Sequence, residues 1–160
     1  MTERPILFSG PKAAGGRGET MTNLSFTAYC KPQPQGSAKA FVVNGKARIT
    51  SDNKNLKPYR HIVAQMAAEA VSEMGLELPY AKKHEPVLIE VSWYLARPTS
   101  VPKKRLRPSV KPDIDKLLRA TLDALTGIAY EDDGQVTCIS ANKYYGAPER
   151  VEIAVCGLKY

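Results

Sequence analysis

The stretch that decides the fold reads Lys111-Pro112-Asp113-Ile114-Asp115-Lys116-Leu117-Leu118-Arg119-Ala120-Thr121-Leu122-Asp123-Ala124-Leu125. Its apolar positions recur every three or four residues, which is the spacing of one face of an amphipathic helix. Pro112 disfavours helix for the residue before it, and Gly127 is typical of a helix stop. The pattern therefore predicts a helix over about residues 114 to 126. The predicted apolar stripe is Ile114, Leu117, Leu118, Thr121, Leu122 and Leu125.

Two aspartates stand at the beginning of this helix. If Asp113 is extended, it points the same way as Asp115, because strand side chains repeat every two residues. Asp115 then falls at or near the N-cap, where a carboxylate meets unpaired N–H groups. Arg119 and Asp123 follow on the side of Asp115, away from the leucines. We expect this polar face to present acid, base and acid above a packed floor.

A second acidic cluster, Glu131-Asp132-Asp133-Gly134, follows the helix. We expect it near the start of the helix, because the strand after it must pack beside the strand that leads into Asp113. Asp113, Asp115 and Asp133 would then converge. Such hard oxygen ligands suit Mg²⁺ or Mn²⁺, which leave positions for a phosphate and a water. A metal of this kind lowers the pKa of bound water and offsets charge on the phosphate.

Purely structural explanations of these acids remain open. Asp115 is a suitable helix cap, Asp-Gly favours a turn, and an Asp-x-Asp pair alone is a weak motif. Arg119 is suited to hold a phosphate oxygen, because its guanidinium is a planar fork of donors.

A basic segment over residues 97 to 111 delivers the chain to the acids. It holds six basic residues, three prolines and no acid, so no regular element is predicted. Its charge exceeds what compensation of the neighbouring acids needs, which favours a bridging polyanion over simple compensation. The candidate DNA-binding residues are Lys103, Lys104, Arg105, Arg107, Lys111 and Lys116.

Composition narrows the class of protein. The 160 residues carry a net charge of +7, which suits either a nucleic-acid-binding protein or an ordinary basic soluble protein. The three cysteines show no metal-ligand or disulfide spacing. No apolar run is long enough to span a membrane, and no signal-peptide core begins the chain. We expect a cytoplasmic protein with a flexible tail over residues 1–22 and one folded domain over residues 23–160.

Further patterns predict an α+β fold, a mixed sheet packed by two main helices. Asn44-Gly45 between short apolar runs predicts a β-hairpin. Its Lys39, Lys46 and Arg48 suit a phosphate-contacting edge, or equally charges that guard a solvated edge. Strands are predicted over residues 24–30, 40–43, 47–50, 87–95, 135–143 and 150–158, and a second helix over 58–74.

Three segments resemble the RusA-like Holliday junction resolvases, whose pattern is D-x-D-N-L, a helix ending in D-A-L, and a D-D-x-Q-V turn. They are Asp113-Ile114-Asp115-Lys116-Leu117, Asp123-Ala124-Leu125-Thr126 and Asp132-Asp133-Gly134-Gln135-Val136. The match is specific over about 25 residues, and the layout is compatible from Leu24 to Tyr160.

The resemblance implies a homodimeric, Mg²⁺-dependent endonuclease that makes paired symmetric nicks in four-way DNA junctions during recombination and repair. It implies that Asp113, Asp115 and Asp133 are the catalytic metal ligands, with Asp132 a weaker candidate. The family's catalytic lysine falls on Arg119, which keeps the charge but does not donate a proton near neutral pH. Lys116 stands where the family usually has Asn. The host would be a bacterial or phage-infected cell.

Two other functions stay open from the sequence. One is a structure-selective nuclease that prefers flaps or replication forks. The other is a non-catalytic basic DNA-binding protein whose acids are caps and turns. Metal-dependent nicking of branched DNA distinguishes both nucleases from the binding protein, and a panel of branched substrates distinguishes the nucleases from each other.

Overall fold

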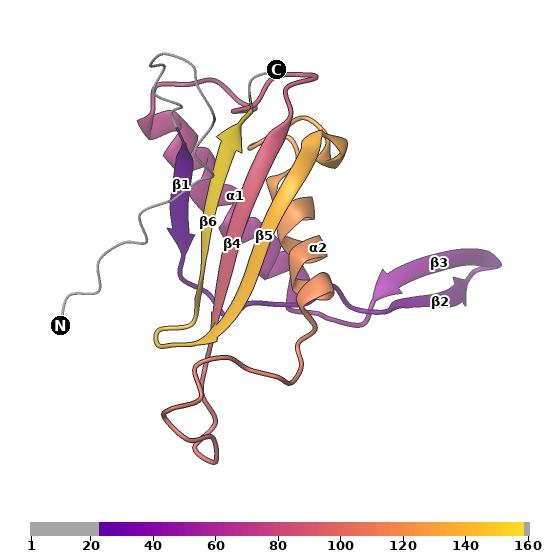
Figure 1. Ribbon diagram of the computed structural model, residues 1–160. Helices are drawn as coiled ribbons and strands as arrows, with labels where there is room; N and C mark the ends of the chain where they lie inside the picture. Colours follow the sequence, from indigo (N-terminus) through magenta and orange to yellow (C-terminus); the bar gives the residue numbers. More distant parts are fainter. Residues whose placement is uncertain (1–22, 159–160) are drawn as a thin grey trace.

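Four strands form one mixed sheet, and both main helices lie against the same face of it (Figure 1). The computed structural model describes residues 23–158, so the predicted tail over residues 1–22 lies outside the described residues. The sheet order is β1-β6-β4-β5. Its strands are β1 Leu24–Ala28, β4 Val87–Leu95, β5 Val136–Tyr145 and β6 Arg150–Gly157. The other elements are β2 Ala38–Val43, β3 Lys46–Ser51, α1 Leu56–Glu73, α2 Ile114–Leu125 and the 3-10 turn η1 Asp133–Gln135.

This architecture confirms the predicted α+β class. Each predicted helix and strand is present, and its ends move by no more than about two residues. The basic segment between β4 and α2 contains no helix or strand, also as predicted.

Strand direction fixes the two ends of the sheet. β4 runs parallel to β5, with Val87 opposite Val136 and Leu95 opposite Tyr145. β6 runs antiparallel to β4, and β1 antiparallel to β6. We call the edge where β4 and β5 begin the Val87 end, and the edge where they finish the Leu95 end. The basic segment leaves the Leu95 end, and α2 then runs back toward the Val87 end (Figure 1).

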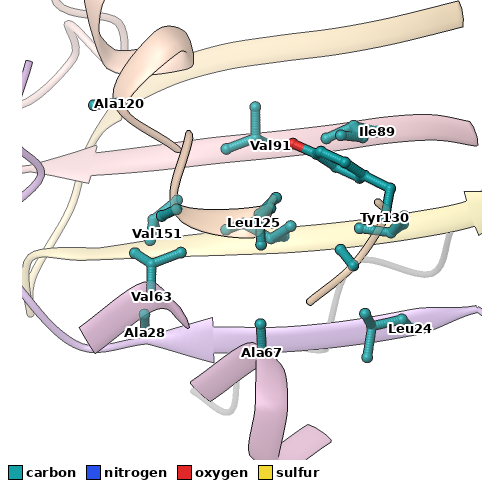
Figure 2. Close-up of a cluster of buried hydrophobic side chains, with 14 of the residues drawn as sticks. Leu24, Ala28, Val63, Ala67, Ile89, Val91, Ala120, Leu125, Tyr130 and Val151 are labelled. Carbon is teal, nitrogen blue, oxygen red and sulfur yellow. The ribbon is translucent and has the colours of Figure 1, made fainter. Parts of the chain in front are cut away.

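The core lies between the sheet and the two helices (Figure 2). Val87, Ile89, Val91, Trp93 and Leu95 alternate toward the helices and are all buried, as period-2 patterning requires. The buried residues of α2 are Leu117, Ala120, Thr121, Ala124 and Leu125.

The α2 stripe is therefore rotated from the predicted one. Leu118 and Leu122 are only partly buried, and Ile114 is 40% exposed beside the two aspartates. The helix ends as expected, because Gly127 adopts a φ of +81° that L side chains rarely take.

One polar network crosses the core and joins three elements. The hydroxyls of Tyr59 on α1 and Thr121 on α2 lie 2.8 Å apart, and the indole N–H of Trp93 on β4 lies 3.2 Å from the Thr121 oxygen. Thr121 in turn donates to the carbonyl of Leu117. Burial raises the pKa of Tyr59 to about 12, so this network is uncharged at neutral pH. It fixes how α2 sits over the sheet.

The β2–β3 hairpin projects away from the sheet and helices (Figure 1). Its two-residue turn has φ of 51° at Asn44 and 73° at Gly45. Positive φ at both positions is what a tight type I′ hairpin turn demands. The Asn-Gly signal is thus confirmed.

Candidate active site at the start of α2

Asp113 is the N-cap residue of α2, with an extended backbone at φ −71° and ψ 139°. The extended conformation was expected, and Asp115 lies near the N-cap as expected, inside the first helical turn. The Asp113 carboxylate makes no capping hydrogen bond. It lies 3.8 Å from the Lys116 ammonium, and its side chain is 46% exposed. The Asp113 carboxylate therefore does not cap the helix, and it remains accessible to a ligand.

Contacts from two other segments hold the start of α2 in place. Lys143, near the end of β5, donates to the carbonyls of Pro112 at 2.9 Å and Val110 at 3.0 Å. The Gln35 N–H donates to the carbonyl of Lys116 at 2.9 Å. The backbone on both sides of Asp113 and Asp115 is thus fixed by hydrogen bonds.

Sequence reasoning missed Lys143, because its place on the sheet is seen only once the strand register is known. The register places Lys143 opposite Trp93, and the two side chains share the face of the sheet that carries the helices. A lysine on a buried face needs polar partners, because burying an unpaired charge is costly. The carbonyls before Asp113 are those partners.

The two remaining residues on the polar face of α2, Arg119 and Asp123, differ in their contacts. Arg119 is exposed one turn after Asp115, which is where two residues at i and i+4 meet. Asp123 instead forms an ion pair with Arg60 of α1. The guanidinium of Arg60 also donates to Gln35 at 2.5 Å, so Asp123 helps to join the two helices and the loop before the hairpin.

The basic segment is irregular but attached to β5. Arg107 donates to the Asn142 side chain and the Tyr144 hydroxyl, each at 3.1 Å, and its guanidinium lies over the Tyr144 ring. Arg97 packs over the ring of Tyr145 in the same way. The remaining predicted DNA-binding residues of this segment are exposed at the Leu95 end: Lys103, Lys104, Arg105 and Lys111.

The second acidic cluster is held at the Val87 end. Gln135 donates to the carbonyls of Lys82 at 2.8 Å and Glu85 at 2.9 Å, next to the start of β4. Asp132 caps η1 by accepting from the Gly134 N–H at 2.8 Å, and Gln135 completes a capping box. Asp132 therefore acts as a helix cap, which is one of the structural roles left open by the sequence. Asp133 is the exposed first residue of η1.

The structure does not bring Asp133 to Asp113 and Asp115 within one chain. That expectation was wrong because β5 runs parallel to β4. Asp133 precedes β5 at the Val87 end, whereas the start of α2 meets Lys143 near the other end of β5. At about 3.3 Å per strand residue the two acidic sites are roughly 20 Å apart. Within residues 23–158, no three His, Cys, Asp or Glu side chains are grouped to hold a metal ion.

A shallow depression of about 410 Å³ opens beside the second cluster. It faces solvent at the Val87 end and is separate from Asp113 and Asp115. Its lining residues are Lys83, His84, Pro86, Glu131, Asp132, Gly134, Gln135 and Thr137.

Comparison with known proteins shows which family this chain resembles. The family model described as Endodeoxyribonuclease RusA matches residues 30–156, which include both acidic clusters, the basic segment and the hairpin. The Uncharacterized protein YqaN of Bacillus subtilis (strain 168) is 30% identical over 138 residues. The alignment covers 84% of this chain and 96% of that protein.

Among residues 23–158, no helix is long and apolar enough to cross a membrane.

Proposed function

This chain belongs to the endodeoxyribonuclease RusA family, and from that membership we propose that it resolves Holliday junctions by metal-dependent phosphodiester hydrolysis in paired nicks. The observation that carries the proposal is the setting of Asp113 and Asp115. Two accessible carboxylates begin a helix, and a basic segment and a basic hairpin rise from the same end of the molecule. A polyanion bound by those bases lies against those acids.

Asp113 and Asp115 fit a divalent cation of the Mg²⁺ type, with Mn²⁺ as a substitute. Mg²⁺ is bound in such enzymes through one or two carboxylates together with substrate phosphates, and it keeps several waters. The Asp113 side chain supports this assignment because it makes no capping hydrogen bond. A metal held there supplies a water of lowered pKa and neutralises charge on the phosphate.

The other roles fall to basic side chains around the acids. In this proposal Arg119, one turn into α2, holds a phosphate oxygen through its planar donors. Lys116 and the exposed bases of the basic segment, Lys103, Lys104, Arg105 and Lys111, hold the backbone of the DNA. Arg107 acts mainly by fixing the basic segment on β5, as its hydrogen bonds with Asn142 and Tyr144 indicate.

Asp133 acts in this proposal on the site of a partner subunit. Within one chain the strand β5 separates Asp133 from the start of α2 by roughly 20 Å, which is too far for the two to hold one metal ion. A two-fold symmetric homodimer can bring each Asp133 to the other copy. The same symmetry supplies two identical sites for the two cuts that a four-way junction needs.

The first half of β5 supports such a dimer. β5 is an edge strand of the sheet, and Thr137, Cys138, Ile139 and Ser140 are all exposed along it. The basic segment bonds only to the other half, where the Tyr145 N–H donates to the Leu106 carbonyl. An unpaired strand edge is a template for pairing with another chain. Antiparallel pairing of two β5 strands around Cys138 sets Asp133 of one copy level with Lys143 of the other, beside the start of α2.

A cleavage assay on defined substrates tests the function. A labelled four-way junction, a flap, a fork and a linear duplex are incubated with the protein in Mg²⁺ or in EDTA. We expect symmetric paired nicks in the junction, only with Mg²⁺, and much less cutting of the other substrates. Preferential cutting of flaps or forks supports the alternative nuclease, and binding without nicking supports the non-catalytic protein.

A further inference from the structure

The β2–β3 hairpin is rooted beside the two aspartates. The Gln35 N–H, before β2, donates to the carbonyl of Lys116, which follows Asp115. After β3, the Asn53 side chain donates to the Pro34 carbonyl at 2.9 Å. Both legs of the hairpin are therefore fixed to one another and to the first turn of α2. From this hydrogen-bonded base the hairpin projects beyond the sheet and helices (Figure 1).

The strand register gives this hairpin two unlike faces. Phe41 lies opposite Arg48, and Val43 opposite Lys46, so these side chains share one face with Lys39. We call it the basic face. Ala40 lies opposite Ile49, and Val42 opposite Ala47. These four make up the apolar face, and residues 38–51 contain no acid at all.

The apolar face has no cover within the described chain. Val42 is 71% exposed and Ile49 is 76% exposed, although both are β-branched and apolar. Phe41 on the other face is 42% exposed. A two-stranded hairpin with open faces is only marginally stable in water, and exposed apolar groups that are gathered at one projecting tip indicate a binding surface.

Charge and size identify the occupant of this surface. The basic face attracts an anionic partner, and the hairpin starts at the proposed site of phosphodiester cleavage. Two alanines, one valine and one isoleucine offer far less than the roughly 800 Å² per partner that a stable protein complex buries. A second copy of the chain is therefore a poor match. DNA suits both faces, because it offers bases to the apolar face and phosphates to the basic face.

Resting on the proposed function, we propose that the hairpin inserts into the branch point of the DNA junction. Apolar side chains inserted between base steps unstack them, and aromatic rings stack on the bases that become exposed. Val42 and Ile49 fill the opening, Phe41 stacks on an unpaired base, and Lys39, Lys46 and Arg48 hold the flanking phosphates. A linear duplex has no such opening, so the hairpin makes binding selective for branched DNA.

A fluorescent base at the branch point tests this insertion. A four-way junction and a linear duplex, each with 2-aminopurine at the same sequence position, are titrated with full-length protein in EDTA. Because 2-aminopurine brightens when it loses its stacking on neighbouring bases, we expect a severalfold rise with the junction and none with the duplex. The double substitution Val42→Ser/Ile49→Ser removes most of the rise and weakens junction binding on the order of tenfold. Duplex binding stays unchanged.

A matched control is Leu76→Ser. Leu76 is an exposed apolar residue just beyond the far end of α1. The Leu76→Ser variant should show the same fluorescence rise with the junction as the wild type. Circular dichroism and thermal unfolding of the hairpin variant match those of the wild type, because neither Val42 nor Ile49 is in the core.

Two outcomes overturn the inference: no rise with the wild type, or an equal rise with the hairpin variant. If the variant with an equal rise also sediments as a smaller species, the apolar face is an interface between copies. Failure of the proposed function is seen separately, since EDTA prevents hydrolysis. A normal rise in EDTA without nicking in Mg²⁺ contradicts nuclease activity and leaves the hairpin inference intact.

Discussion

The ammonium of Lys143 lies 2.9 Å from the carbonyl oxygen of Pro112, the residue directly before Asp113. A second hydrogen bond, to the Val110 carbonyl, ties this lysine to the bend that leads into α2. The end of β5 therefore sets the backbone from which the Asp113 carboxylate projects. Lys143 is a positioning residue in this account.

Lys143→Met should lower the rate of junction cleavage on the order of tenfold, because small displacements of a catalytic group are costly. Junction binding in EDTA should change by no more than about twofold, since Lys143 points at backbone carbonyls. Lys143→Arg keeps a donor and should recover most of the rate. Equal loss of binding and rate in Lys143→Met would mean that the lysine holds DNA instead.

Mixing two inactive variants tests whether the metal site is shared between subunits. Asp115→Asn and Asp133→Asn are each inactive as homodimers if both carboxylates are needed. In a mixed dimer, one site carries both substitutions and the other carries neither. Co-refolded protein should therefore regain about a quarter of the wild-type sites and cut one strand per junction. If Asp133 served its own chain, both sites of the mixed dimer would be broken and no nicking would return.

The exposed bases of the basic segment should determine the salt dependence of DNA binding. Replacing Lys103, Lys104 and Arg105 by Ala should weaken binding to all DNA substrates. The slope of log affinity against log salt should become shallower by about one for each phosphate that the variant no longer neutralises. Lys103→Arg/Lys104→Arg keeps the charges and should keep the slope. A triple alanine variant with an unchanged slope would remove these residues from the DNA interface.

Ionisation of Tyr59 should weaken the fold at high pH. Burial raises the pKa of this phenol from 10 to about 12 in the folded state. Its contribution to stability is therefore complete below pH 10 and is lost as the pH rises through about 12. Tyr59→Phe should cost about 1 kcal/mol of unfolding free energy at pH 8, and that difference should shrink above pH 10. Urea unfolding, followed by the fluorescence of Trp93, the single tryptophan, measures this free-energy difference at pH 8 and at higher pH. A difference that stays constant to pH 11 would contradict the assignment.

The sequence was sufficient to predict the elements because their signals are local. The β4 pattern predicts Val87–Leu95 to the residue, and Asn44-Gly45 predicts the hairpin, because alternation and turn chemistry depend only on near neighbours. The position of Asp113 at the mouth of α2 follows from the same kind of signal.

The placement of Asp133 could not be predicted in this way. Whether β5 pairs parallel or antiparallel to β4 depends on how the chain crosses over, and a parallel strand starts at the opposite end from an antiparallel one. The predicted convergence of the three aspartates placed Asp133 at the Leu95 end of the sheet, whereas it lies at the Val87 end. Asp132 was ambiguous for a related reason, since a capping box and a metal site use the same residue types; in the structure it accepts a hydrogen bond from the Gly134 N–H as a cap.

Junction cleavage by the Asp115→Asn variant tests whether the carboxylates at the start of α2 support metal-assisted hydrolysis. The substitution is nearly isosteric at an exposed position, so the variant should fold and should bind a labelled four-way junction in EDTA as the wild type does. With Mg²⁺ it should make no detectable nicks, while the control Glu73→Gln, at an exposed position in the last turn of α1, should cut normally. An Asp115→Asn variant that cuts the junction at the wild-type rate would contradict metal-assisted hydrolysis at the start of α2.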